Sequence, residues 1–155
     1  MVIPEFQKMN KKIIIIATFI ISCNQNNTST NEAKQQMIKT DSAMSEMAAK
    51  EGFNSAILFY ADSDIVKFDG QQLPVIGKIA FAKSFDKNSD IKTISWKPVK
   101  GEVAQSGDLG FTWGNWKLVA PDTTYYGNYF TAWKKQKDGS WKVALDGGNS
   151  TPKPE

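Results

Sequence analysis

An aspartate on the apolar face of a predicted helix is the residue of this chain best placed to do chemistry. Met37, Met44 and Ala48 recur at helical spacing, and Asp41 falls within the same stripe. Because burying a bare carboxylate is costly, Asp41 must either accept hydrogen bonds or carry a proton. Desolvation raises the pKa of a carboxyl group, which suits a general base or a neutral acid donor. The structural alternative is that Asp41 caps a helix beginning at Ser42, or bonds to strand backbone.

A second carboxylate, Asp146, ends the last predicted strand and precedes two glycines. Alternation along the strand places Asp146 on the face opposite Val143 and Leu145, which we expect in the core. A bulge at the glycine pair would return Asp146 to the core side. The sequence therefore leaves two possibilities, a carboxylate in a pocket or one that stabilises a turn.

Aromatic side chains could form the walls of a pocket for an apolar molecule. Trp113, Tyr129 and Trp133 lie on neighbouring predicted strands, and Tyr60 lies near the end of a predicted helix. Each combines a large apolar surface with one N–H or O–H group for a ligand. Core packing or a dimer face is the alternative for the strand residues, and a half-buried ring for Tyr60. The candidate pocket residues are thus Asp41, Tyr60, Trp113, Tyr129, Trp133 and Asp146.

The residue types that the chain lacks exclude several kinds of chemistry. Its 155 residues include no His and no Arg, and Cys23 is the only cysteine. Without His, serine–histidine and cysteine–histidine catalysis are impossible, and a zinc site is not expected. Without Arg, the bidentate clamp for phosphate or carboxylate is missing. Any reaction would rest on Asp, Glu, Lys, Tyr and ordered water, and we expect neither metal nor cofactor.

The elements that must position these residues change in character along the chain. Helical periodicity dominates the first half of the domain, and the second half reads as long strands separated by turn signals. Helices followed by an antiparallel meander indicate an α+β fold with helices on one face of the sheet. We expect helices over 32–51, 53–61 and 78–85, a short strand over 64–69, and long strands over 93–105, 109–120, 125–135 and 141–146.

Five short strings within these elements are similar to those of a known family. They are Thr40-Asp41-Ser42-Ala43-Met44, Gly52-Phe53, Pro74-Val75-Ile76-Gly77-Lys78, Ser106-Gly107-Asp108-Leu109-Gly110-Phe111-Thr112-Trp113-Gly114 and Asp138-Gly139-Ser140-Trp141-Lys142-Val143. Together they resemble the family called domain of unknown function 4440. The order of elements resembles the wider nuclear transport factor 2-like superfamily, which includes ketosteroid isomerase and the polyketide cyclases.

The resemblance implies a cone-shaped fold. In that superfamily a strongly curved antiparallel sheet wraps about three N-terminal helices and leaves a pocket at the wide end. The resemblance also implies an acid at the position of Asp41 and a homodimer. Because this fold hosts enzymes and simple binders alike, it does not settle the function.

The N-terminal segment predicts export from the cytoplasm. Lys11 and Lys12 precede an apolar run over 13–21 that is shorter than the roughly 20 residues needed to span a bilayer. Ile20-Ile21-Ser22-Cys23 resembles a bacterial lipoprotein signal box, with Ile20 where Leu is usual. In that family the cysteine is lipidated and becomes the first residue of the mature protein. The alternative is a plain signal peptide with an incidental cysteine.

The chain thus divides into four predicted segments. Residues 1–22 are the signal peptide, of which 1–8 read as a spurious start before Met9, and 23–31 are the lipidated Cys23 and a flexible tether. The nuclear transport factor 2-like domain spans 32–150, and 151–155 form a tail. Removing the signal lowers the formal net charge from +3 to +1, because Lys8, Lys11, Lys12 and Glu5 leave with it. No basic stripe remains, so no nucleic-acid partner is expected.

These features favour a lipid-anchored domain of the cell envelope that binds a small, largely apolar molecule. One alternative is a carboxylate-based isomerase, dehydratase or cyclase, in which Asp41 moves a proton and Tyr129 or Trp113 bonds a developing oxyanion. Another is a homodimeric interaction module that uses an exposed sheet face. The expected partners are the apolar molecule, the membrane through the lipid on Cys23, and a second copy of the chain.

Overall fold

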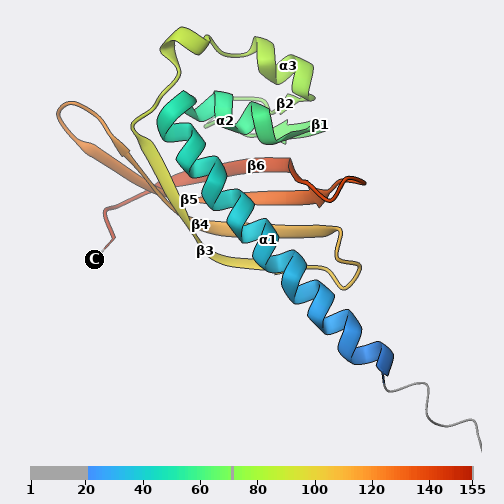
Figure 1. Ribbon diagram of the computed structural model, residues 1–155. Helices are drawn as coiled ribbons and strands as arrows, with labels where there is room; N and C mark the ends of the chain where they lie inside the picture. Colours follow the sequence, from blue (N-terminus) through green and yellow to red (C-terminus); the bar gives the residue numbers. More distant parts are fainter. Residues whose placement is uncertain (1–20, 71, 155) are drawn as a thin grey trace, which may run out of the picture.

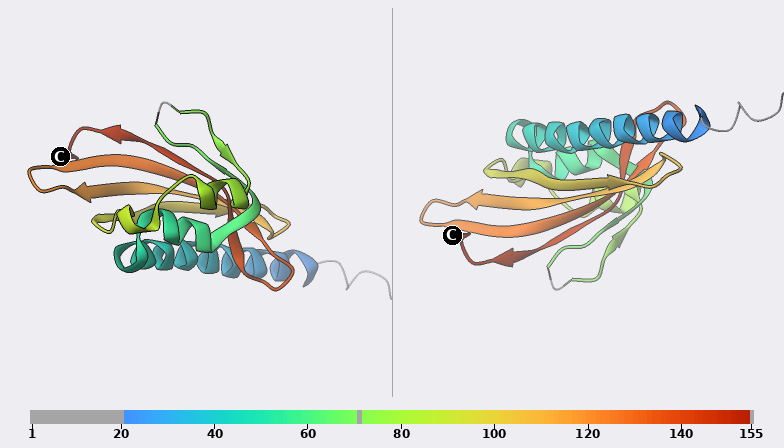
Figure 2. Two further views of the ribbon diagram at one scale, coloured as in Figure 1. Left: turned by 90° about the horizontal axis from the view of Figure 1, so that it is seen from above. Right: turned by 90° about the horizontal axis from the view of Figure 1, so that it is seen from below.

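Three helices lie on one face of a six-stranded sheet in the computed structural model, which describes residues 21–70 and 72–154 (Figure 1). The expected α+β cone, with a strongly curved sheet around N-terminal helices, is confirmed (Figure 2). The helices are α1 (Ile21–Glu51), α2 (Phe53–Tyr60) and α3 (Lys78–Lys83), with a 3-10 turn, η1 (Lys87–Ser89). The strands are β1 (Ala61–Lys67), β2 (Val75–Ile76), β3 (Ile94–Val103), β4 (Leu109–Val119), β5 (Thr124–Lys135) and β6 (Trp141–Thr151).

The sheet is mixed, whereas the sequence predicts an antiparallel one. Its order is β2-β1-β6-β5-β4-β3, and β3 to β6 form the expected antiparallel meander. Strand β1 lies parallel to β6, with Val66 opposite Leu145. The two strands are far apart in the sequence, so no hairpin turn imposes an antiparallel direction on them. Their pairing brings the end of β1 beside the middle of β6.

Helix α1 packs closely across the inner face of the sheet because two strand glycines make room for it. A Cβ on Gly101 of β3 would stand 2.8 Å from Cγ1 of Ile38, and one on Gly110 of β4 would stand 2.6 Å from Sδ of Met37. Met37 and Met44 are buried by this contact. The stripe predicted from the sequence therefore does face the sheet, and it carries Asp41 inward with it.

The first helix begins earlier than the sequence predicts. It runs from Ile21, so that 24–31, expected as an irregular tether, continue the helix. These polar residues show no apolar period from which a helix could be predicted, and among the described side chains of α1, from 29 onward, the first buried one is Ala33. Residues 1–20, with most of the expected signal, lie outside the described part of the chain. The signal peptide and the lipidation of Cys23 therefore remain predictions.

The last strand continues past the two glycines at which the sequence predicts that it ends. Gly147 and Gly148 pair with Phe130 and Tyr129 of β5, and pairing goes on to Thr151. The long neighbouring strand supplies backbone partners, and these outweigh the weak strand propensity of glycine. The extension forms one side of the pocket described below.

The start of α2 is held in place by a residue distant in the sequence. The carboxylate of Asp90 accepts hydrogen bonds from the backbone N–H groups of Asn54 (2.9 Å) and Ser55 (2.8 Å), and so caps the helix. Gly52, at φ 110°, leaves space for this carboxylate, since a Cβ there would meet Oδ2 of Asp90. The cap fixes Phe53, the first residue of α2 and a wall of the pocket.

No helix in the described part of the chain is long and apolar enough to cross a membrane.

Candidate functional site

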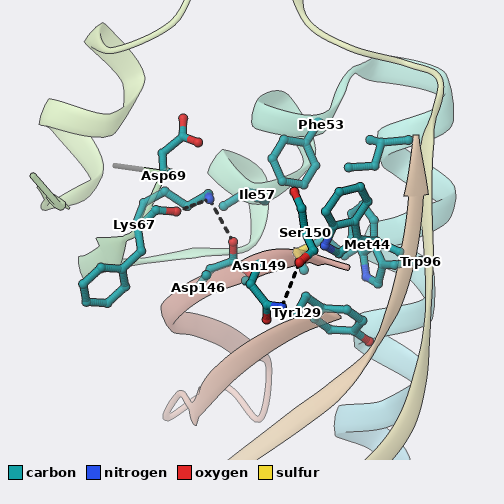
Figure 3. A pocket seen from close by; sticks show the side chains of 16 residues that line it. Met44, Phe53, Ile57, Lys67, Asp69, Trp96, Tyr129, Asp146, Asn149 and Ser150 are labelled. Atoms are coloured by element: carbon teal, nitrogen blue, oxygen red, sulfur yellow. Dashed lines mark hydrogen bonds and ion pairs between the residues drawn. The ribbon is translucent and has the colours of Figure 1, made fainter. Parts of the chain in front are cut away.

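A pocket of about 290 Å³ opens on the helical side of the sheet, between α2, the end of β1 and the extended part of β6 (Figure 3). Its volume lies just below the range of about 300–1,000 Å³ that small-molecule sites occupy. Ile57 and Met44 add apolar surface, and the backbone of Gly147 and Gly148 forms one edge. Its aromatic walls are Phe53, Phe68, Trp96, Trp116 and Tyr129.

A buried ion pair supplies the inner polar part of the pocket, and exposed Asp69, Asn149 and Ser150 line its edge. Nζ of Lys67 lies 3.2 Å from Oδ1 of Asp146, and the hydroxyl of Thr131 donates to Oδ2 of Asp146 at 2.8 Å. The same ammonium donates to the backbone carbonyl of Phe68 at 2.8 Å, and it lies 5.4 Å from the ring centroid of Phe53. Because both charges are compensated, the pair puts a polar but electrically neutral group beside the aromatic walls.

A β-bulge turns Asp146 toward the pocket. Trp133 of β5 lies opposite Val143, and Ala132 lies opposite Leu145, so Ala144 is an extra residue in β6. The extra residue reverses the alternation, and Val143 and Asp146 are both buried on the inner face. The sequence predicts this reversal only with a bulge at the glycine pair. The bulge exists, but it precedes Asp146 instead of following it.

Asp41 lies behind the pocket wall instead of in the pocket. Its carboxylate is fully buried; Oδ2 accepts from the hydroxyl of Tyr129 at 2.6 Å and Oδ1 from Nε1 of Trp96 at 2.8 Å. Thr112 is a further hydrogen-bonding partner. Asp41 is not among the residues that line the pocket, yet it holds two that are. Because α1 runs unbroken through it, Asp41 is not a helix cap, which removes that alternative.

Burial and hydrogen bonding act on the charge of Asp41 in opposite directions. Burial raises the pKa of the carboxyl group above its usual range, whereas the bonds from Tyr129, Trp96 and Thr112 favour the charged form and lower the pKa. Burial is the largest of these causes, and nearby Asp146 adds to it, so the pKa is raised. Burial and the Asp41 carboxylate also raise the pKa of the Tyr129 phenol. Tyr129 thus stays protonated and remains a donor.

The other sequence candidates lie away from the pocket. Trp133 is a core residue whose Nε1 donates to Oγ1 of Thr112 at 2.8 Å. Trp113 is 38% exposed on the outer face, because alternation in β4 turns Thr112 inward. Tyr60 lines a separate groove beside α2. Of the six predicted residues, only Tyr129 and Asp146 line the pocket, and Asp41 supports it.

The sequence analysis did not single out Lys67, which lines the pocket. A signal was present, because Lys67 has the same strand parity as buried Ile65. The roles of Trp96 and Trp116 could not be chosen from the sequence, and both are pocket walls. In the described residues no group of three or more His, Cys, Asp or Glu side chains could hold a metal ion.

Comparison with known proteins assigns the fold. No family model and no curated protein matches this sequence, so the similarity to domain of unknown function 4440 stays a prediction. Among solved structures, a ketosteroid isomerase-like protein from Erwinia carotovora atroseptica is 18% identical with a TM-score of 0.61, covering 80% of this chain and 99% of its own. An NTF2-like protein with a cystatin-like fold from Novosphingobium aromaticivorans is 10% identical with a TM-score of 0.65, covering 88% and 93%. A candidate scytalone dehydratase from the same organism is 14% identical with a TM-score of 0.58, covering 83% and 88%. At these identities the likeness concerns the fold, which is NTF2-like.

Replacing Asp41 by Asn should remove a pH dependence of stability. The pKa of Asp41 in the folded protein lies above its ordinary value of 3.8, so the folded state binds this proton more tightly than the unfolded state. The contribution of Asp41 to the free energy of unfolding is therefore largest below pH 3.8 and is lost as the pH rises through the folded pKa. Urea denaturation from about pH 3 to about pH 7 measures this, and the wild type should lose stability relative to Asp41→Asn across that interval.

A control for this experiment is Gln105→Ala, which removes no titrating group from an exposed position. Its difference from the wild type should not change with pH. Parallel pH profiles for Asp41→Asn and the wild type would contradict the raised pKa.

Proposed function

We propose that this chain binds a small, largely apolar molecule in the pocket between α2, β1 and β6. The proposal rests mainly on one observation, a pocket of about 290 Å³ walled by five aromatic side chains with a single buried ion pair among them. Aromatic walls supply most of the binding energy for such a molecule, and the few polar groups orient it. Lys67 and Asp146 compensate each other, and exposed Asp69 at the edge of the pocket adds one negative charge, so the lining disfavours an anionic ligand.

The hydrogen bonding of the acids favours binding over catalysis. A general base must come within about 3 Å of the proton that it removes. Asp41 does not line the pocket, and its two oxygens accept from Trp96 and Tyr129. Asp146 does line the pocket, but the ammonium of Lys67 stabilises its charged form, which makes it a weaker base. The hydroxyl of Tyr129 is directed to Asp41, so it is not free to stabilise an oxyanion. These groups act to hold the walls of the pocket.

A carboxylate enzyme is the second candidate. The raised pKa of Asp41 and its 2.6 Å hydrogen bond to Tyr129 favour it, because an acid that carries a proton can donate it. The ketosteroid isomerase-like and candidate dehydratase neighbours have the same fold. In this function Tyr129, which lines the pocket, would relay a proton between Asp41 and a bound substrate. The substrate would be isomerised or dehydrated. Conversion of a bound compound to a new product would favour this candidate over the binder.

Ligand binding is tested by a thermal-shift screen of the full chain against neutral aromatic compounds. A compound present at about 100 times its Kd should stabilise the protein by about 2.7 kcal/mol. Ser150→Trp places a large side chain at an exposed position on the edge of the pocket, and should weaken binding at least about tenfold by occupying the space. The control is Ser106→Trp, in the exposed turn between β3 and β4, which should bind like the wild type. Equal affinity in both variants would refute the pocket as the site.

A cell-envelope location is part of the proposal and is supported by the lipoprotein-like segment that ends at Cys23. Cys23→Ser should move the protein from the membrane fraction to the soluble fraction, because the acceptor of the lipid is lost. Asn26→Ser, which leaves the cysteine intact, is the control. Retention of Cys23→Ser in the membrane fraction would contradict lipid anchoring.

The homodimer expected from the sequence is supported by the outer face of the sheet. Phe111 of β4 and Phe130 of β5 stack there with ring centroids 5.6 Å apart, and Leu109 and Trp113 are exposed beside them. Exposed aromatic side chains on adjacent strands are typical of an interaction surface. We propose that a second copy of the chain covers this face.

Sedimentation equilibrium tests the dimer. The wild type should sediment with twice the chain mass, and Trp113→Lys should sediment as a monomer, because a charge would be buried without a partner. Ile79→Lys, at a 76% exposed position on α3, is the control and should stay dimeric. A monomeric wild type would refute the proposal.

A further inference from the structure

A second hollow lies where α1, the end of α2 and the hairpin between β5 and β6 meet. It is an open groove of about 760 Å³, and it shares no lining residue with the pocket. Phe59, Tyr60 and Trp141 give it an aromatic surface, and Phe59 is 57% exposed. Three lysines also line the groove, namely Lys39, Lys135 and Lys142.

Two of these lysines rest on the aromatic rings of the groove. Nζ of Lys142 lies 5.3 Å from the ring centroid of Phe59 and 6.0 Å from that of Tyr60, and donates to the backbone carbonyl of Phe59 at 3.2 Å. Nζ of Lys135 lies 5.8 Å from the ring centroid of Trp141. The rings hold the ammonium groups at the groove while leaving donors available. Within the described residues, the ion pairs found involve other lysines.

The groove carries an excess of positive charge. Asp138 is the only acid among its lining residues, and it accepts hydrogen bonds from the backbone N–H (2.9 Å) and the hydroxyl (2.7 Å) of Ser140. Glu46 acts on Tyr60 from the side of α1, and Lys142 acts on Asp138 within the groove and on Lys78 of α3. Three lining ammonium groups and one lining carboxylate give the groove a net charge of about +2. A ligand with two negative charges would balance it.

Trp141 belongs to the wall of the groove and to the core behind it. Its side chain is 3% exposed, and within the described residues its Nε1–H is buried without a hydrogen-bond partner, out of reach of a molecule in the groove. What Trp141 offers to the groove is its ring, over which the ammonium of Lys135 lies. Lys135 is thereby held where it can bind an anion.

We propose that this groove binds a dianionic molecule with a flat aromatic part, a phosphate monoester or a dicarboxylate. Its negative charge meets Lys39, Lys135 and Lys142, and its ring packs against exposed Phe59. The site is separate from the pocket for a neutral ligand, so either proposal can fail without the other.

The binding is tested by NMR titration of the full chain with 1-naphthyl phosphate and with 2,3-naphthalenedicarboxylate. The indole N–H resonance of Trp141, identified by its loss in Trp141→Phe, should shift and saturate with at least one of them. The resonance of Trp96, which lines the pocket, should not shift. Which of the two compounds binds more tightly shows whether the groove prefers a phosphate or two carboxylates. Neutral 1-naphthol and inorganic phosphate should both bind more weakly, because 1-naphthol lacks the two negative charges and inorganic phosphate lacks the aromatic ring.

Charge variants complete the test. Lys135→Gln and Lys142→Gln should each weaken binding of the naphthyl dianion roughly two- to fivefold, and salt should weaken it further. Lys117→Gln, an exposed lysine of β4 outside the groove, is the control and should bind like the wild type. The proposal would be overturned by unchanged affinity in the Lys135→Gln/Lys142→Gln double variant, by equally tight binding of 1-naphthol, or by a shift at Trp96 in place of Trp141.

Discussion

The buried carboxylate of Asp41 joins the long helix to the sheet, and the shape of the pocket depends on this junction. One side chain of α1 accepts from Trp96 of β3 and Tyr129 of β5 and also bonds to Thr112 of β4. Such a carboxylate is costly to bury, and its donors would be costly to leave unpaired, so helix and strands are held in one arrangement. Trp96 and Tyr129 thereby become fixed walls. The most chemically suggestive residue of the sequence has its clearest role in positioning the residues that meet the ligand.

The polar part of the pocket depends on the pairing of strands at the other side of the sheet. Parallel pairing of β1 with β6 brings Lys67 opposite Asp146, and the bulge at Ala144 turns Asp146 inward. The resulting ion pair is neutral and engaged at both oxygens of the carboxylate. Such a pair orients a ligand better than it transfers protons, which is why binding is the favoured function.

Three surfaces of one small domain therefore differ in the chemistry that they offer. The pocket combines aromatic walls with a compensated charge pair, and the groove at the β5–β6 hairpin combines aromatic rings with three lysines against one acid. The outer face of the sheet is aromatic around Phe111 and Phe130. Since the inner and outer faces alternate along the same strands, β4 and β5 contribute to both the pocket and the outer face. A ligand in the pocket and a partner on the outer face would thus contact opposite sides of the same backbone.

The sequence by itself determined the features that depend on local periodicity. The α+β class, the order of the three helices and the five longer strands, and the inward position of Asp41 follow from spacings of a few residues, which repeat in any context. The two-residue strand β2 is too short to show such a spacing. The tertiary structure decided what depends on a partner strand or helix. The bulge that turns Asp146 inward, the continuation of β6 through its glycines and the burial of Lys67 all follow from neighbours that the local pattern does not reveal. The sequence alone predicts that Thr112 and Trp113 lie on opposite faces of the sheet. Only the packing of α1 decides that Trp113 faces outward, because a strand has two faces and one helix layer covers only one of them.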